Sequence, residues 1–532
     1  MNKSVSIQRP VAAGPNIKTK GGHPMKLFSR ILAILLALSL MPLACTALAE
    51  EPVTITIWGS DRENMPFRNG LMTIEMLKEK LGINIEIISA PTESLAEKYG
   101  LLMAGGDIPT IVQYKAKDLL LYKDAWQPLN DLINETDTPN LWKVYSDPEI
   151  RRKVSDADGN MRFIGQRTAI TAGKLYFYRQ DWLDKLGLET PKTVEDLYNV
   201  FVAIRDGDPN GNGEKDEVPF AVRKNGSNNR GNVMPFVHNW GIAETFFAED
   251  GQVKFGATDP RMKEALEWLH RCYEEKLLDQ EYLTRDKTAW YSQWTNNQVF
   301  MSYDWSAYID NVSNLFKGQD SGVHIVGAVP PEGPTGISET RDQLQPITVD
   351  EDWNAGIFVG ASAEQKAAAL KLFDYLYSEE GMILLNFGVE GEHFNVIDGE
   401  YVYSDLIMNN PDGLSPQDAL RTFGIQSMLT LLQDARYERA FVSDEVNRIR
   451  DIYEQEGHIG PAFPTLAFTN DEQSVINEKY TEIETYVNEM IDKFIMGVEP
   501  LDHFDAYAAQ VESMGLKDVL KVYQDAYDRY MK

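Results

Sequence analysis

One loop of this sequence carries oxygen-bearing side chains at the spacing of a metal site. The run from Asp208 to Glu217 reads DPNGNGEKDE. Oxygens at its first, third and fifth positions can converge on one point, and Gly213 at the sixth position permits the sharp bend of an EF-hand-type calcium loop. The pattern therefore predicts a Ca²⁺ site. Its expected ligands are Asp208, Asn210, Asn212, the backbone carbonyl of Glu214, Asp216 and Glu217.

The loop departs from the full EF-hand pattern at its end. The twelfth position is Pro219, so the bidentate glutamate is missing, and Asp216 and Glu217 are the residues available to replace it. A plain polar turn rich in Asp, Asn and Gly is the alternative. We expect calcium in a structural role, because an ion that binds only the folded state stabilises that state. We do not expect it to touch the ligand of the protein.

Aromatic side chains are the second group with a chemical use, because flat apolar rings stack on sugar faces. The chain has 10 Trp, 24 Tyr and 22 Phe residues. Trp58 ends the first expected strand, and ligands of α/β folds bind at the carboxyl ends of strands. Packing in a core is the alternative for every ring. The candidate ligand-binding residues are Trp58, Arg62, Arg167, Trp240, Tyr303, Trp305 and Trp353.

The charge of the chain limits its partners. The net charge is -30, with no local run of Lys or Arg, which argues against binding to nucleic acid or to an anionic membrane surface. An arginine fork suits a sugar that bears a carboxylate, whereas an acidic surface favours a neutral one. The charge of the ligand therefore stays open.

Motifs of catalysis are missing from the sequence. It contains no G-x-S-x-G, no H-E-x-x-H and no P-loop, and its seven His show no metal-binding spacing. A secreted glycoside hydrolase stays open as an alternative, because its two carboxyl groups need only a defined separation across a cleft. Two cysteines, Cys45 and Cys272, are too few for a disulfide framework, and Cys272 lies in a helical pattern typical of core packing.

The N-terminal residues predict export. From Met25, the expected start, Lys26 and Arg30 precede an apolar stretch and then small residues, as in a secretory signal peptide that ends at Ala49. Cleavage before Glu50 competes with a degenerate lipoprotein box that would place a lipid on Cys45. We favour free secretion, because folded sequence is expected to begin near residue 53 and a lipid would leave almost no tether.

Local patterns predict alternating strands and helices, which is typical of an α/β fold with a mostly parallel first sheet. Proline at a first turn, glycine after a last turn and Ser/Thr-x-x-Glu/Gln capping boxes mark the helix ends. Strands are expected at Val53–Trp58, Ile83–Ile88, Thr110–Tyr114, Val323–Val329 and Ala355–Val359. Helices are expected at Met72–Leu81, Leu95–Ala104, Asp181–Leu186, Thr193–Ile204, Pro260–Glu275, from Ser362 through Tyr377, from Thr469 to Gly497, and over most of Phe504–Tyr530.

Several stretches, in their order, resemble the large sugar-binding lipoproteins of ABC importers. These belong to the family 1 extracellular solute-binding class, which includes maltose-binding protein, and the calcium-like loop is most similar to that of alginate-binding members. The stretches are ITIWGSD (Ile55–Asp61), AGGDIPTIVQY (Ala104–Tyr114), WQPLNDLI (Trp126–Ile133), YFYRQDWLDKLGLETPKTVEDLY (Tyr176–Tyr198), ALEWLHRCYEEKLLDQE (Ala265–Glu281), NNQVFMSYDW (Asn296–Trp305) and FGVEGEHF (Phe387–Phe394).

The resemblance implies a two-lobe, type II periplasmic-binding-protein-like α/β fold with a ligand cleft between the lobes and an extended helical C-terminal region. After a leader and signal peptide at 1–49, it implies one lobe of 50–165 with 335–388 and a second of 166–334 with 389–532. Trp305 matches a stacking position of maltose-binding relatives.

The resemblance also implies a function. It implies a binding protein rather than an enzyme, which captures an oligosaccharide outside the cytoplasm, as a monomer, and delivers it to the permease subunits of an ABC transporter. A peptide or another solute is the alternative cargo, because one fold hosts many ligands.

Overall fold

A computed structural model describes residues 51–532, except 169–170, 225–231, 319–321, 342, 344–346 and 349–351. The chain divides into two units, Met1–Pro52 and Val53–Lys532. The predicted leader and signal peptide at 1–49, with Cys45, lie outside the described residues. All helices and strands below belong to the second unit, and none of its described helices is long and apolar enough to cross a bilayer.

The first sheet has the predicted mostly parallel character. Its order is β12-β3-β1-β2, in which β1 runs parallel to β2 and β3, and β12 is antiparallel to β3. Gly82 ends the first helix in a left-handed conformation, with φ at 62°. The elements are β1 (Thr54–Asp61), α2 (Met72–Leu81), β2 (Asn84–Pro91), α3 (Leu95–Gly105), β3 (Ile111–Tyr114), β12 (Asn354–Ile357) and α12 (Ala363–Leu376).

The second sheet is mainly antiparallel, in the order β10-β5-β9-β6. Strand β5 pairs antiparallel with β10 and β9, and β6 runs parallel to β9. Its strands are β5 (Lys174–Arg179), β6 (Val218–Phe220), β9 (Val299–Trp305) and β10 (Ile325–Ala328). The surrounding helices are α7 (Gln180–Leu186), α8 (Val194–Gly207), α9 (Pro260–Glu274), α10 (Lys287–Thr295), α11 (Ala307–Leu315) and α17 (Asp444–Gln455).

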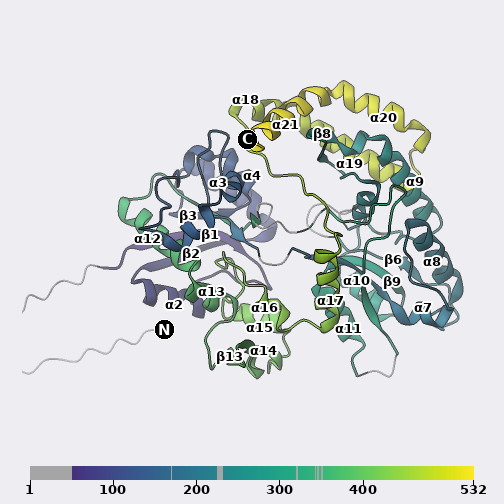
Figure 1. Ribbon diagram of the computed structural model, residues 1–532, viewed down its shortest axis with the longest axis horizontal. Coiled ribbons are helices and arrows are strands. Elements are labelled where there is room, and N and C mark those ends of the chain that lie inside the picture. Colours follow the sequence, from purple (N-terminus) through teal and green to yellow (C-terminus); the bar gives the residue numbers. More distant parts are fainter. Residues whose placement is uncertain are drawn as a thin grey trace, which may run out of the picture. The chain divides into compact units, whose positions relative to one another are not determined.

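The predicted helical C-terminal region is confirmed. Figure 1 shows its helices beside α9 and the hairpin that contains β8, and apolar residues such as Ile483 and Phe494 join the core of the second sheet. Thr469 caps the first of these helices with Glu472 as predicted, and Gly497 ends the helix α19 (Thr481–Met496), also as predicted. The elements are β7 (Phe246–Glu249), β8 (Gln252–Phe255), α18 (Asn470–Val475), α19 (Thr481–Met496), α20 (Phe504–Val511) and α21 (Lys517–Tyr530).

Each sheet has its own hydrophobic core. The first includes Ile57 and Leu372, and residues from much later in the chain, Met428 and Leu429, are buried in it. Cys272 is 2% exposed in the core of the second sheet, as expected. A smaller cluster at residues 387–437 surrounds Phe387. The chain therefore passes between the cores several times, and the predicted bounds of the two lobes stay a prediction.

The remaining elements are short. They are α4 (Ala116–Leu121), α5 (Pro139–Tyr145), α6 (Pro148–Lys153), β4 (Gln166–Arg167), η3 (Met234–Trp240), β11 (Ile347–Thr348), α13 (Glu379–Asn386), β13 (Phe394–Ile397), β14 (Glu400–Tyr403), α14 (Asp405–Met408), α15 (Pro416–Thr422) and α16 (Arg436–Arg439).

Candidate ligand-binding site

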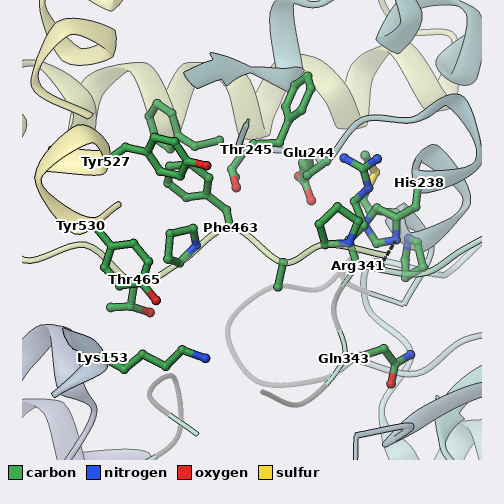
Figure 2. Close-up of a pocket in the computed structure, with 18 of the residues that line it drawn as sticks. Lys153, His238, Glu244, Thr245, Arg341, Gln343, Phe463, Thr465, Tyr527 and Tyr530 are labelled. Atoms are coloured by element: carbon green, nitrogen blue, oxygen red, sulfur yellow. Dashed lines mark hydrogen bonds between the residues drawn. The ribbon is translucent and has the colours of Figure 1, made fainter. Parts of the chain in front are cut away.

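A cavity of about 710 Å³ is lined by segments from distant parts of the sequence. They are α6, η3, the residues before and within β7, the loop that carries Arg341 and Gln343, the stretch 461–465, and the end of α21. Figure 2 shows Lys153 and Gln343 on one side and Thr245, Phe463 and Tyr527 on the other. This volume suits a ligand of several rings.

Aromatic rings form one wall of the cavity. Phe463 stacks on Tyr527 with ring centroids 5.7 Å apart and an interplanar angle of 13°. Phe246, which also lines the cavity, stacks on Tyr523 with ring centroids 3.6 Å apart. Tyr530 adds a further ring (Figure 2). Such rings offer the flat apolar surface on which a sugar face stacks.

Polar groups of both kinds line the rest of the cavity. The backbone N–H of Arg341 donates to Nδ1 of His238 at 3.1 Å, and the Arg341 Nε donates to Glu339 at 2.7 Å. The Gln343 amide donates to the carbonyl of Lys174 at 2.8 Å, which holds it at the start of β5. Donors and acceptors are therefore fixed around the space, as a ligand rich in hydroxyl groups requires.

At the first sheet, the structure brings two predicted residues together and places a third close by. Arg62 forms an ion pair with Asp352, and its guanidinium lies 6.0 Å from the centre of the Trp353 ring. Trp58 is 4% exposed and contacts Tyr114, with ring centroids 6.0 Å apart. Burial, with the charges of Asp118 and Asp352, raises the pKa of Tyr114 to about 12.

At the second sheet, Trp305 is more accessible than the buried Tyr303. It is half-buried at the end of β9, and Lys174 Nζ lies 5.6 Å from its ring centre. Tyr303 is fully buried and accepts a hydrogen bond of 3.3 Å from Gln343. The carboxylate of Asp304, between them, accepts the N–H of Trp305 at 2.8 Å.

The remaining two predicted residues lie apart from these. Trp240 is 3% exposed, in the core beside Trp268. Arg167 pairs through its backbone with Ile347, where β4 meets β11. The binding roles of all seven residues stay predictions.

Sequence reasoning missed most of the cavity. Lys153, His238, Glu244, Arg341 and Phe463 line it, but they come from helix ends and irregular loops that carry no periodic pattern. They can be identified as a group only because the fold places them around one cavity.

The predicted calcium loop is a tight polar turn that begins where α8 ends. Asp208 has a φ of 47°, and its carboxylate accepts the backbone N–H groups of Gly211, Asn212 and Gly213 at 2.8, 3.1 and 3.2 Å. Asp216 accepts the side-chain amides of Asn210 and Asn212, both at 3.0 Å. Gln298, just before β9, donates to Asp216 at 2.9 Å and so ties the loop to the second sheet.

Glu217 directly follows this turn in the sequence, and its carboxylate is buried. It is 7% exposed, and neither of its oxygens has a hydrogen bond of ordinary geometry. Burial, together with the charges of Asp216 and Asp208, raises the pKa of Glu217. Among the described residues, no three His, Cys, Asp or Glu side chains are grouped as a metal site. A cation here would therefore rely on amide and backbone oxygens as well as carboxylates.

Two α/β lobes, a helical C-terminal region and a cavity lined by rings and polar groups define a two-domain periplasmic-binding-protein-like fold. The chain belongs to the family described as bacterial extracellular solute-binding protein, whose sequence model matches residues 74–383. The predicted fold class and family are therefore confirmed.

Known proteins similar to this chain span most of its length. One is the fructooligosaccharide ABC transporter substrate-binding protein FusA of Streptococcus pneumoniae serotype 4, 23% identical over 87% of this chain and 87% of FusA. Another is the lipoprotein LipO of Bacillus subtilis, 24% identical over 85% of this chain and 89% of LipO. Among solved structures, alginate-binding protein AlgQ2 without calcium ion has a TM-score of 0.75 and 26% identity, and covers 90% of this chain and 98% of AlgQ2.

Proposed function

We propose that this protein captures an oligosaccharide outside the cytoplasm and delivers it to the permease subunits of an ABC importer. The observation that carries the proposal is the cavity of about 710 Å³, which combines stacked rings with fixed donors and acceptors in a chain of the solute-binding family. The relatives support it, because FusA is a substrate-binding protein for fructooligosaccharides. We propose binding without turnover, as a monomer.

The contacts around the cavity support capture by closure of two lobes. The Arg152 guanidinium of α6 donates to the carbonyl of Tyr530 at 2.9 Å and lies over its ring. Elements of the first core and the C-terminal helix thus meet beside the cavity. A ligand that contacts both would favour the closed arrangement, because only that arrangement offers all its contacts.

We also propose that the loop at Asp208 binds Ca²⁺ in a structural role. The residues fit, because the Glu217 carboxylate is buried beside Asp216 and Asp208 and has no hydrogen bond of ordinary geometry to a described residue, which favours a cation there. Asp208, Asn210, Asn212, the Glu214 carbonyl and the two later carboxylates would hold it. The bound ion would neutralise this acidic turn. Two solved structures of similar proteins support the proposal: one is of AlgQ2 without calcium ion, and the other is of an EF-hand mutant of FusA.

A thermal-shift screen of the processed protein tests the proposed function. The panel contains neutral oligosaccharides, uronic-acid oligosaccharides and short peptides. A ligand at a hundred times its Kd should stabilise the folded state by about 2.7 kcal/mol. A shift with one saccharide class and no release of reducing sugar is the expected result. A shift with peptides alone, or turnover of a glycan, would overturn the proposal.

A further inference from the structure

The turn after β1 gathers hydrogen-bond donors that lack acceptors. The Nε atoms of Arg62 and Arg421 and the Nε1 of Trp353 are all buried without a hydrogen-bond partner among the described residues. Arginine and tryptophan side chains donate only, so these three groups share one unmet requirement, an acceptor. Leaving a buried donor without an acceptor is costly. In native proteins such a donor is normally paired with a protein group, an ordered water or a ligand.

Arg421 sits on the same turn as Arg62. Residues 62–65 form a tight turn in which Arg62 and Met65 exchange backbone hydrogen bonds. The Nη1 of Arg421 donates to the carbonyl of Asn64 at 3.4 Å, a long bond, and is the one described hydrogen bond of its side chain. The position is fixed, because Thr73 at the start of α2 bonds the backbone just after α15 through its N–H and its hydroxyl, at 3.2 Å each.

The carboxylates near Arg421 are engaged elsewhere. Asp352 pairs with Arg62, and Glu438 pairs with Arg450 at 2.7 Å. Asp418, one turn earlier in α15, accepts the hydroxyl of Ser415 at 2.7 Å. Among the described residues, none of them lies within ion-pair distance of Arg421, whose pKa is lowered by burial and by the charge of Arg62. Within the described part of the chain, Arg421 thus has no ion-pair partner, although Asp418 and Glu438 are close enough for their charges to act on it.

We propose that Arg421 and Arg62 form an anion-recognition subsite, and that the cargo is a saccharide bearing carboxylate groups, as in a uronic-acid oligosaccharide. This rests on the proposed function and names the ligand class, and it adds a contact beyond the residues that line the cavity of about 710 Å³. A guanidinium matches a carboxylate with two parallel hydrogen bonds. The ring of Trp353, 6.0 Å from the Arg62 guanidinium, supplies the flat face for the sugar that carries it.

The acidity of the whole chain does not oppose this assignment. At physiological ionic strength the Debye length is about 8 Å, so most of the net charge of -30 is screened at the subsite. Neighbouring groups decide the local preference. A neutral sugar would leave Arg421 without an ion-pair partner among the described residues, whereas a carboxylate would supply one.

Isothermal titration calorimetry of the processed protein tests the inference with uronic-acid trisaccharides and their carboxyl-reduced, neutral forms of equal length. We expect the uronate to bind at least about 10-fold more tightly than its reduced form. Arg421→Gln should weaken uronate binding about 10- to 100-fold and change binding of the reduced form little. Arg436→Gln is the matched control, since Arg436 is exposed on a nearby helix and paired with Asp434.

Equal binding of the two forms, or an Arg421→Gln variant that weakens both equally or neither, would overturn the subsite. If Arg421→Gln fails to fold, as judged by circular dichroism, the wild-type comparison and Arg62→Gln still decide. Binding of neutral oligosaccharides alone would overturn the subsite and leave the proposed function standing. Binding of no saccharide would overturn both.

Discussion

Replacing Asp208 by alanine should remove the calcium response of the protein and part of its stability without calcium. The carboxylate of half-buried Asp208 accepts three backbone N–H groups at 2.8, 3.1 and 3.2 Å from exposed residues of the turn. Net contributions of such bonds are about 0.5–1 kcal/mol each, so the variant should lose about 1.5–3 kcal/mol in the presence of a chelator. At calcium a hundred times its Kd, the wild type gains about a further 2.7 kcal/mol that the variant lacks.

Urea unfolding followed by tryptophan fluorescence, with EDTA and with calcium, measures both quantities. The matched control is Glu214→Gln, because the backbone carbonyl of Glu214, and not its side chain, is the expected ligand. The control should keep the calcium response. The reasoning is refuted if calcium leaves the wild type unchanged, or if Glu214→Gln loses the response as fully as Asp208→Ala. Sugar affinity should survive EDTA, since the ion is not expected to touch the ligand.

Three further predictions concern the second sheet and the C-terminal helices. Asp304→Asn should destabilise the fold by about 3–5 kcal/mol in urea unfolding, because it leaves buried Arg223 without the partner it contacts at 2.6 and 2.8 Å. Trp305→Ala should weaken saccharide binding about 10-fold in calorimetry by removing a stacking face. Burial opposes ionisation of Glu472, but hydrogen bonds from Arg529 outweigh this effect and lower the pKa of Glu472. The pair therefore stabilises the fold above pH 4.5, and this contribution is lost as the pH falls through the folded-state pKa. Glu472→Gln should flatten that part of a stability profile measured from pH 3 to 7.

Each of these has a control or an outcome that contradicts it. Asp434→Asn breaks an ion pair with exposed Arg436 and should cost less than about 1 kcal/mol, so an equal loss would contradict the role of burial at Asp304. Trp182→Ala should lower stability but not the affinity of the folded protein, because Trp182 is 1% exposed in the core. An unchanged pH profile for Glu472→Gln would show that the Arg529 contact contributes nothing.

Local chemistry was enough to predict many elements. Helix α2 has the predicted bounds, because a left-handed glycine ends it, and the capping boxes at Ser362 and Thr469 start α12 and α18 as expected. Strand pairing was harder. The antiparallel pairing of β5 with β9 joins residues more than a hundred positions apart, and no local pattern encodes it.

The site could be predicted only in part for the same reason. Arg62 and Trp353 were separate candidates, but the Asp352 that joins them is 290 positions from Arg62. Arg421 belongs to no local sequence motif. Its proposed role in binding an anion can be inferred only from the residues around it in the folded protein. From the sequence alone, Trp240 and Trp305 were both candidates for ligand binding. Their burial in the folded protein distinguishes the core ring of Trp240 from the half-buried ring of Trp305.

Cys272 gives the protein a practical property for measuring its motion. It is the single free thiol of the described chain, it is 2% exposed in α9, and burial raises its pKa well above the usual range. Because the thiolate is the reactive form, maleimide dyes should pass it by in the folded state. A pair of cysteines introduced at exposed positions, one on each lobe, can then carry fluorophores while the native thiol stays in place. Energy transfer between them would report opening and closing in single molecules.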